Sequence, residues 1–258
     1  MQALGAHAAR VRGLWKSLFP WKSHLRKPRT RAACAPRFGR AVSQVGGLSG
    51  LTGMKLFVLG ANGRTGTQIV NLALIRGHEV TAFVRSPQKL KPAGSLTIVR
   101  GDPQRVETIA AALPGHDAVL SAIGPPPREA IFHQSTLLTD CARATVEAMT
   151  ACGVSRLAIV SAAVLFPGKG LYFAFFRWLL KYHAHDLCGM EDLVRASGLA
   201  WTIARPPRLT NSPDVNFRAF RDTLPPGSRA MSFRAVAAFM LDAVERRSHV
   251  AEVVGLGR

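Results

Sequence analysis

The sequence predicts a doubly wound α/β fold, in which helices cover both faces of a mainly parallel sheet. Three observations predict it: a glycine-punctuated turn joins an apolar strand to a helix, a second strand follows directly, and strands and helices then alternate. The alternation begins at Met54 and uses up the remaining chain. We therefore expect one domain over residues 54–258 and a separate basic segment over residues 1–53.

The first predicted unit is a short buried strand, a turn and a helix. Residues 55–59 form an apolar run that is flanked by glycines, as is typical of a buried parallel strand. The turn from Gly60 to Gly66 has the spacing Gly-x-x-Gly-x-x-Gly, a shifted relative of the dinucleotide fingerprint. A one-faced helix over residues 67–77 follows. Because glycines admit a phosphate closely and a helix N-terminus offers free N–H groups, we expect a pyrophosphate site; a plain tight turn is the alternative.

The end of the second predicted strand, residues 78–84, favours NADP over NAD. An NAD site needs a carboxylate there to accept hydrogen bonds from the 2′-hydroxyl group, whereas this chain has Arg85 and Ser86. A guanidinium binds a 2′-phosphate with two hydrogen bonds, and Arg64 in the glycine turn can contact the phosphate from its other side. The alternative is that Arg85 is an ordinary solvated arginine.

The remaining elements continue the alternation. We expect strands at residues 95–100, 117–124, 156–161 and 199–205, and helices at 106–113, about 130–152 and about 188–197. Ligands of such sheets bind beyond the carboxyl ends of the strands. One crevice should therefore gather the residues at those ends, namely Gly60, Arg85, Asp102, Ser121, Gly124, Ser161 and Arg205.

Five segments of the chain together carry a family resemblance. They are the turn Gly60–Gly66, the pairs Val84-Arg85, Gly101-Asp102 and Ser161-Ala162, and residues 196–210. Together they resemble the atypical short-chain dehydrogenase group of NAD(P)H-binding proteins, which includes the flavin-reductase type of biliverdin reductase and the NmrA-like proteins. The resemblance covers nearly all of residues 54–258 and implies a Rossmann fold. It implies the following cofactor contacts: Gly60, Asn62, Gly63, Arg64, Thr65 and Gly66 around the pyrophosphate, Arg85 at the 2′-phosphate, Asp102 near adenine, and Ser121 to Gly124 along the riboses.

The catalytic pair of ordinary short-chain dehydrogenases is missing. Those enzymes use Tyr-x-x-x-Lys, whereas Tyr182 is followed four residues later by Asp186, and Tyr172 by Phe176. Ser161 matches the family's active-site serine, and we expect it to hydrogen-bond a substrate carbonyl or a flavin; a serine that closes a turn is the alternative. Further proton carriers would be His183, His185, Asp186 and Glu191, although charges on a helix surface explain these residues equally simply.

The expected function is an NADPH-dependent oxidoreductase that transfers hydride to a flavin, quinone or other small acceptor, because solvent can then supply the proton. A non-catalytic NADP-sensing regulator of the NmrA-like kind and an epimerase relative are the alternatives. The aromatic segment over residues 164–182 would suit a flat acceptor, a membrane surface, a dimer interface or simple packing. It is too short and too interrupted to span a bilayer.

Charge and cysteine usage bound the remaining possibilities. Residues 1–53 contain ten Lys or Arg and no Asp or Glu, within a formal net charge of +19. This segment is either a transit peptide, which implies the mitochondrial matrix, or an upstream extension before a start at Met54, which implies the cytoplasm. The arginines of the domain are scattered, so we expect no specific nucleic-acid partner. None of the four cysteines has metal-ligand spacing to another, so we expect reduced thiols. They are Cys34, Cys141, Cys152 and Cys188.

Overall fold

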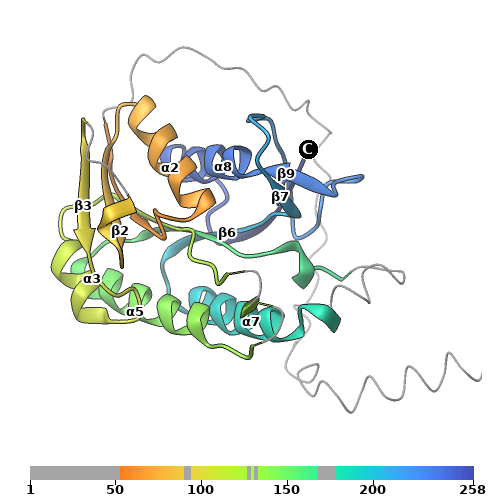
Figure 1. Ribbon diagram of the computed structural model, residues 1–258, viewed down its shortest axis with the longest axis horizontal. Coiled ribbons are helices and arrows are strands. Elements are labelled where there is room, and N and C mark those ends of the chain that lie inside the picture. The colour runs from red at the N-terminus through yellow and green to blue at the C-terminus, as the bar shows by residue number, and fades with distance from the viewer. Residues whose placement is uncertain (1–52, 90–93, 127–128, 131–132, 168–177) are drawn as a thin grey trace, which may run out of the picture. The chain divides into compact units, whose positions relative to one another are not determined.

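The computed structural model describes residues 53–89, 94–126, 129–130, 133–167 and 178–258 (Figure 1). The basic segment 1–53, apart from its last residue, lies outside the described residues, and so does the middle of the aromatic segment, residues 168–177. The two interpretations of the basic segment therefore remain predictions. Among the described residues, none of the helices is long and apolar enough to cross a membrane.

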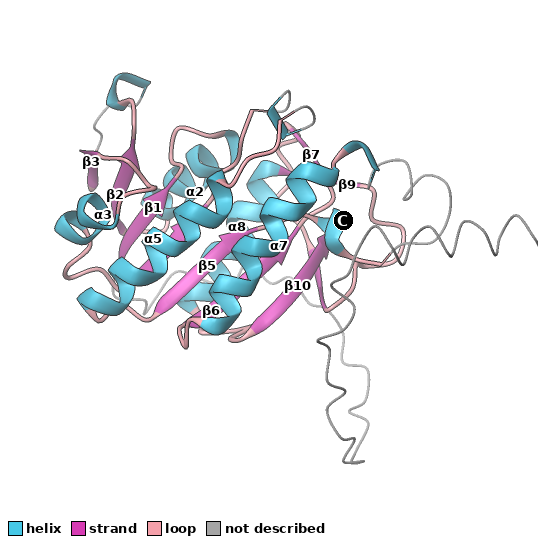
Figure 2. Cartoon of the chain, turned by 90° about the horizontal axis from the view of Figure 1, so that it is seen from below, coloured by secondary structure: helices cyan, strands magenta, loops and turns pink. Residues whose placement is uncertain are grey.

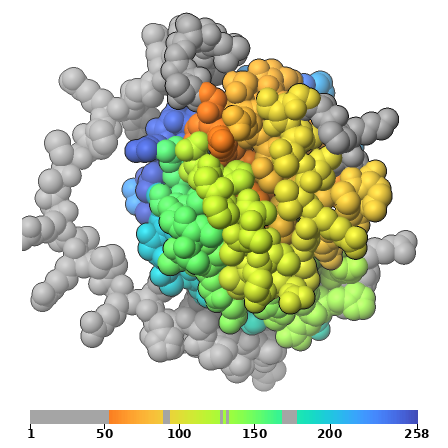
Figure 3. All heavy atoms as spheres, turned by 90° about the vertical axis from the view of Figure 1, so that its left-hand side faces the viewer, coloured from red at the N-terminus to blue at the C-terminus, as the bar shows by residue number. Residues whose placement is uncertain are grey.

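An eight-stranded sheet forms the centre of the domain, in the order β3-β2-β1-β4-β5-β6-β10-β8. Seven of its strands are parallel, and β8 at one edge runs antiparallel to β10. At the other edge lies β3, which belongs to the side of the molecule that faces the viewer in Figure 3. The strands are β1 (Lys55–Leu59), β2 (Glu79–Val84), β3 (Leu96–Arg100), β4 (Ala118–Ser121), β5 (Arg156–Val160), β6 (Ala200–Arg205), β8 (Arg218–Arg221) and β10 (Glu252–Gly257).

The strand order reverses between β1 and β4, and this reversal is the topological switch point where doubly wound sheets bind ligands. The predicted doubly wound α/β fold is confirmed by this order and by the parallel pairing on both sides of β1. A small second sheet, which was not predicted, pairs β7 (Arg208–Thr210) with β9 (Ala230–Ser232) just after the carboxyl end of β6.

Helices cover both faces of the large sheet (Figures 1 and 2). On one face, α2 (Arg64–Ile75) and α8 (Phe233–Glu245) lie side by side. On the other face, α5 (Leu137–Cys152) lies between α3 (Val106–Ala112) and α7 (Lys181–Ala196). Two single turns of 3₁₀ helix, η2 (Pro87–Lys89) and η3 (Ala163–Leu165), follow β2 and β5.

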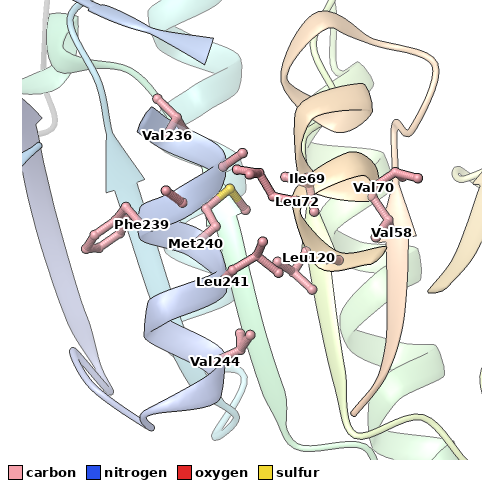
Figure 4. Packing of buried hydrophobic residues seen from close by; sticks show 14 of the residues in the cluster. Val58, Ile69, Val70, Leu72, Leu120, Val236, Phe239, Met240, Leu241 and Val244 are labelled. Atoms are coloured by element: carbon pink, nitrogen blue, oxygen red, sulfur yellow. The ribbon is translucent and has the colours of Figure 1, made fainter. Parts of the chain in front are cut away.

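The apolar core has one cluster on each face of the sheet. Between the sheet and the pair α2 and α8, alternate residues of the strands meet the apolar sides of both helices. Figure 4 shows Met240 and Leu241 of α8 beside Ile69 and Leu72 of α2, with Leu120 of β4 in the same cluster. All five residues are buried, so this helix pair holds the start of α2, and with it the glycine turn, against the sheet.

Two helices begin elsewhere than predicted, and one buried carboxylate explains the first difference. The helix predicted from about residue 130 begins at Leu137. There, Asp186 of α7 accepts hydrogen bonds from the backbone N–H groups of Leu138 (3.0 Å) and Thr139 (2.9 Å), and from the Thr139 hydroxyl (2.8 Å). A carboxylate at this position satisfies the free donors of the first turn and favours a helix start.

The second difference is that α7 begins at Lys181, seven residues before the predicted start at about residue 188. Its first two turns are rich in polar residues, so this stretch of the sequence shows no apolar helical periodicity. In the fold, Asp186 and Leu187 at the end of this stretch are buried against α5. Tertiary contacts with α5 therefore stabilise a helical stretch that the apolar pattern did not indicate.

Met240→Ala should lower the free energy of unfolding by about 2–5 kcal/mol, because it leaves a cavity between α8 and α2 where the side chain is fully buried. Urea unfolding followed by circular dichroism measures the change. Asn71→Ala, on the exposed side of α2, is the control and should stay within about 0.5 kcal/mol of wild type. Equal stabilities for Met240→Ala and wild type would contradict the packing of α8 on α2.

Asp186→Ala should destabilise the fold by about 1–3 kcal/mol, because three donors at the start of α5 lose their acceptor. The neighbouring exposed carboxylate provides the matched control, Asp192→Ala, for which we expect almost no change. The same urea titration distinguishes the two variants, and an unchanged midpoint for Asp186→Ala would show that the start of α5 does not need this cap.

Candidate cofactor site

The glycine turn brings three pieces of backbone into close contact. Gly60 has φ +76°, and a Cβ there would lie 2.8 Å from the carbonyl oxygen of Ala122, directly after β4. A Cβ on Gly66 would lie 2.7 Å from the Cα of Ala61 and would collide with the Gly60 carbonyl oxygen. Both positions therefore require glycine, so that the start of α2 can lie against the end of β1 and the loop after β4.

The N-terminus of α2 leaves its first N–H groups without a side-chain cap. Gly63 is the N-cap residue, and no side chain bonds to the helix there. The first helical hydrogen bond of this turn runs from the Thr67 N–H to the Gly63 oxygen (2.9 Å), so the N–H groups before it are outside the helical ladder. Free donors of this kind, together with the positive end of the helix dipole, are what a helix start offers to an anion.

Two side chains of the turn are held by neighbouring elements. Asn62 donates a hydrogen bond from Nδ2 to the carbonyl oxygen of Ser86 (2.7 Å) and so ties the turn to the loop after β2. Its Oδ1 atom is buried and has no partner among the described residues. Arg64 lies with its guanidinium carbon 4.6 Å from the centre of the Phe233 ring, at the start of α8. Since a buried acceptor without a partner is costly, the Asn62 oxygen fits a site that a ligand donor or water completes.

A cleft of about 700 Å³ opens at the carboxyl ends of β2, β3 and β4. Its volume is in the usual range for a small-molecule site. Two of the predicted site residues, Arg85 and Gly124, line this cleft. Asp102 lies beside it, because its carboxylate accepts a hydrogen bond from the N–H of Gln104 (3.0 Å), which is a lining residue. The lining residues are Arg85, Gln104, Gly124, Pro126, Glu129, Gln134, Ser135, Thr136 and Leu137.

The carboxyl ends of the next strands along the same sheet edge hold the other predicted site residues. These are Ser121 at β4, Ser161 at β5 and Arg205 at β6. Ser121 and Ser161 are buried, and neither lines the cleft. The Ser161 hydroxyl lies 2.6 Å from Oε1 of Glu191 on α7. Arg205 pairs with the same carboxylate through two nitrogens, at 2.8 and 2.6 Å, and its guanidinium carbon lies 4.7 Å from the centre of the Phe166 ring.

The structure thus places the predicted site residues in two adjacent groups. Arg85 and Gly124 line the cleft, and the glycine turn lies next to it, because Asn62 bonds to Ser86, the residue after Arg85. Ser161 and Arg205 belong to a buried network farther along the sheet. No local pattern in the sequence indicates the pairing of Glu191 with Arg205. The two residues are 14 positions apart and lie on different elements, so only the chain's path over the sheet brings them together.

The proposed proton carriers on α7 have other contacts. Asp186 caps α5, and Glu191 is bound by arginines, so neither is a surface charge as the simple explanation supposed. Burial lowers the pKa of His183, and the nearby Asp186 raises it less, so this imidazole is neutral at pH 7. His185 is exposed.

Cys141 lies on α5 close to the charges of the cleft. Burial, and after it the negative charge of Asp102, raises the pKa of this thiol to about 12, although Arg85 acts in the opposite direction. The thiol therefore stays protonated at neutral pH and is a poor nucleophile. Cys141, Cys152 and Cys188 are all free thiols.

Comparisons with known proteins identify relatives of this chain. A chloroplastic protein of Arabidopsis thaliana is 32% identical over 219 residues, which cover 78% of this chain and 76% of the relative. The uncharacterized sugar epimerase YhfK of Bacillus subtilis is 31% identical over 166 residues, or 62% of this chain and 74% of that protein.

Solved structures share the architecture. A Rossmann-fold NAD(P)-binding protein of Shigella flexneri superposes with a TM-score of 0.61 at 26% identity, over 80% of this chain and 93% of the other. A Streptococcus pneumoniae protein, provisionally assigned as an NADH-flavin reductase, gives 0.64 at 25% identity, over 80% and 100%. The model of the NAD(P)H-binding family matches residues 60–247, from the glycine turn to the end of α8 and just beyond. The chain is therefore a member of the NAD(P)H-binding family, with the Rossmann fold and the atypical short-chain dehydrogenase character that its sequence predicts.

Proposed function

We propose that this protein is an NADPH-dependent oxidoreductase that transfers hydride to a flat acceptor such as a quinone or a flavin. The observation that carries the proposal is the exposed Arg85, which lines the cleft at the end of β2, where an NAD-specific site would need a carboxylate. Membership of the NAD(P)H-binding family supports the cofactor class. The similarity to the Streptococcus pneumoniae protein, at 25% identity, supports the reaction class.

The residues of the cleft and of the adjacent glycine turn fit NADP(H). The glycine turn and the uncapped start of α2 would bind the pyrophosphate, and the unpartnered Oδ1 of Asn62 would accept a hydrogen bond from the bound cofactor or its water. Arg85 would bind the 2′-phosphate, and Asp102 would lie near the adenine. The carboxylate among the cleft residues, Glu129, comes from the segment between β4 and α5 rather than from the end of β2.

The proposed reaction needs no acid of the protein. When bound, the reduced nicotinamide supplies a hydride, that is, one proton and two electrons. A quinone that takes up this hydride and one proton from water becomes a hydroquinone, so the sum is NADPH, quinone and H⁺ giving NADP⁺ and hydroquinone. This balance agrees with the chain, because Tyr-x-x-x-Lys is missing and Asp186 and Glu191 are engaged elsewhere.

The second candidate is an NADP-binding regulator without turnover. The same observation that Asp186 and Glu191 have other partners favours it, because such a protein needs a cofactor site and no proton carrier. Incubating the protein with NADPH, then adding FMN or a short quinone, separates the two functions by absorbance at the reduced-nicotinamide band. Oxidation supports the reductase, whereas binding without oxidation by either acceptor contradicts it.

Arg85→Glu should weaken NADPH binding about ten- to hundredfold and leave NADH binding almost unchanged, because only NADPH carries the 2′-phosphate. Isothermal titration calorimetry measures both affinities. Arg246→Glu is the control for the charge change, because Arg246 is exposed at the far end of α8. Equal losses for both nucleotides would contradict the assignment of the 2′-phosphate to Arg85.

Asn62→Asp should weaken NADPH and NADH alike, by about tenfold or more, because a new negative charge would then stand in the turn that binds the pyrophosphate of both. The same substitution on the exposed side of α2, Asn71→Asp, is the matched control and should leave both affinities unchanged. If Asn62→Asp binds both nucleotides as tightly as wild type, the turn is not the pyrophosphate site.

A further inference from the structure

A buried carboxylate holds the hydroxyl of Ser161. Glu191 is 1% exposed, Ser161 is 6% exposed, and the distance from Oγ to Oε1 is 2.6 Å. The Ser161 backbone is fixed as well, because its N–H donates to the carbonyl oxygen of Ala204 on β6 (2.7 Å). The oxygen of this side chain therefore has a defined position at the carboxyl end of β5.

The other partners of Glu191 decide which of the two groups donates. Arg205 donates to Oε1 from Nε (2.8 Å) and to Oε2 from Nη2 (2.6 Å), and Arg195 donates to Oε2 from Nη2 (2.7 Å). A guanidinium has only donors, so each of these bonds needs a lone pair of the carboxylate. Glu191 is thus an ionised acceptor at both oxygens, and the hydroxyl of Ser161 must be the donor in the fourth contact.

A serine that has given its single proton to a carboxylate can only accept further hydrogen bonds. A carbonyl oxygen placed against Ser161 would meet lone pairs instead of a donor. We propose that Glu191 is a positioning residue that makes Ser161 a hydrogen-bond acceptor, so that the ligand group beside Ser161 is an N–H or O–H donor. This inference rests on the proposed function and on the position of Ser161 at the carboxyl end of β5, the edge of the sheet at which doubly wound folds bind ligands. It reverses the expectation that Ser161 donates to a substrate carbonyl.

An acceptor-only Ser161 distinguishes the oxidised from the reduced form of the ligand. In the reaction above, the oxidised quinone has only carbonyl oxygens, whereas its hydroquinone has two O–H donors. An acceptor-only Ser161 therefore favours the reduced ligand. A flavin offers the N3–H group as a donor in its oxidised form. A serine with only a structural role at the end of β5 would not distinguish these groups.

The test compares the binding of tetramethylbenzoquinone and its hydroquinone to the full-length protein saturated with NADP⁺, under anaerobic conditions. The two rings have the same carbon skeleton, and with NADP⁺ the quinone is not reduced, so affinity is measured by calorimetry without turnover. In Ser161→Ala the affinity for the hydroquinone should fall about two- to tenfold, as expected for one hydrogen bond, while that for the quinone stays the same or rises.

Glu191→Gln should reverse the preference. Oε2 faces two guanidinium N–H groups and Oε1 only one, so the amide NH₂ of glutamine is better tolerated at the Ser161 end. It would donate to Ser161 and release the hydroxyl proton toward the ligand, which raises the affinity for the quinone relative to the hydroquinone. Asp192→Asn, the same change on the exposed side of α7, is the control and should keep the wild-type ratio.

The outcomes separate this inference from the proposed function. Equal losses of both ligands in Ser161→Ala, a greater loss of the quinone, or no binding of either ligand to wild type would overturn the acceptor role. Thermal unfolding confirms that each variant is folded, and Ser161→Ala decides the question if Glu191→Gln does not fold. NADPH oxidation by the quinone, measured on the same wild-type protein, tests the reductase function separately.

Discussion

The arrangement of the site depends on the close backbone contacts of the turn between β1 and α2. Gly66 lets the first turn of α2 lie against Gly60, and Gly60 in turn lies against the backbone that follows β4. A side chain at either position would push the helix away from the sheet. Because both contacts are present, the free N–H groups of α2, the amide of Asn62 and the loops after β2 and β4 meet at the switch point of the sheet.

A second constraint acts farther along the same edge. Glu191 of α7 joins the ends of β5 and β6 through Ser161 and Arg205, and Asp186, five residues earlier on the same helix, caps α5. The two carboxylates therefore place α5 and α7 relative to the strand ends. Removing one partner of a buried ion pair leaves an uncompensated charge. A substitution at Glu191 or Arg205 should therefore destabilise the fold at the ends of β5 and β6.

Much of the fold could be predicted because its elements have a strong local pattern. The strands from β1 to β6 are short apolar runs between turn residues, and the glycine turn has a recognisable spacing. The elements after Arg205 were not predicted. Helix α8 is buried on nearly all sides, so its apolar residues show no single face, and β7, β8 and β9 have only three or four residues each.

The strand-end residues of the candidate site could be predicted from the sequence, but their partners on the helices could not. Residues within a few positions of a strand end, such as Arg85 after β2 and Gly124 after β4, can be placed from the sequence, because parallel strands end at one edge. The partners of Ser161 could not be placed, because Glu191 comes from a helix whose start was itself mispredicted. The direction of the hydrogen bond between them also depends on Arg195 and Arg205, and no local pattern links these residues.

A crystal structure of the full-length protein with NADP⁺ tests whether the cleft beside the glycine turn binds NADP(H). We expect density for the pyrophosphate at the turn from Gly60 to Gly66 and for the 2′-phosphate at Arg85. Density for the cofactor elsewhere on the protein, or none in this cleft at a saturating concentration, would contradict this assignment.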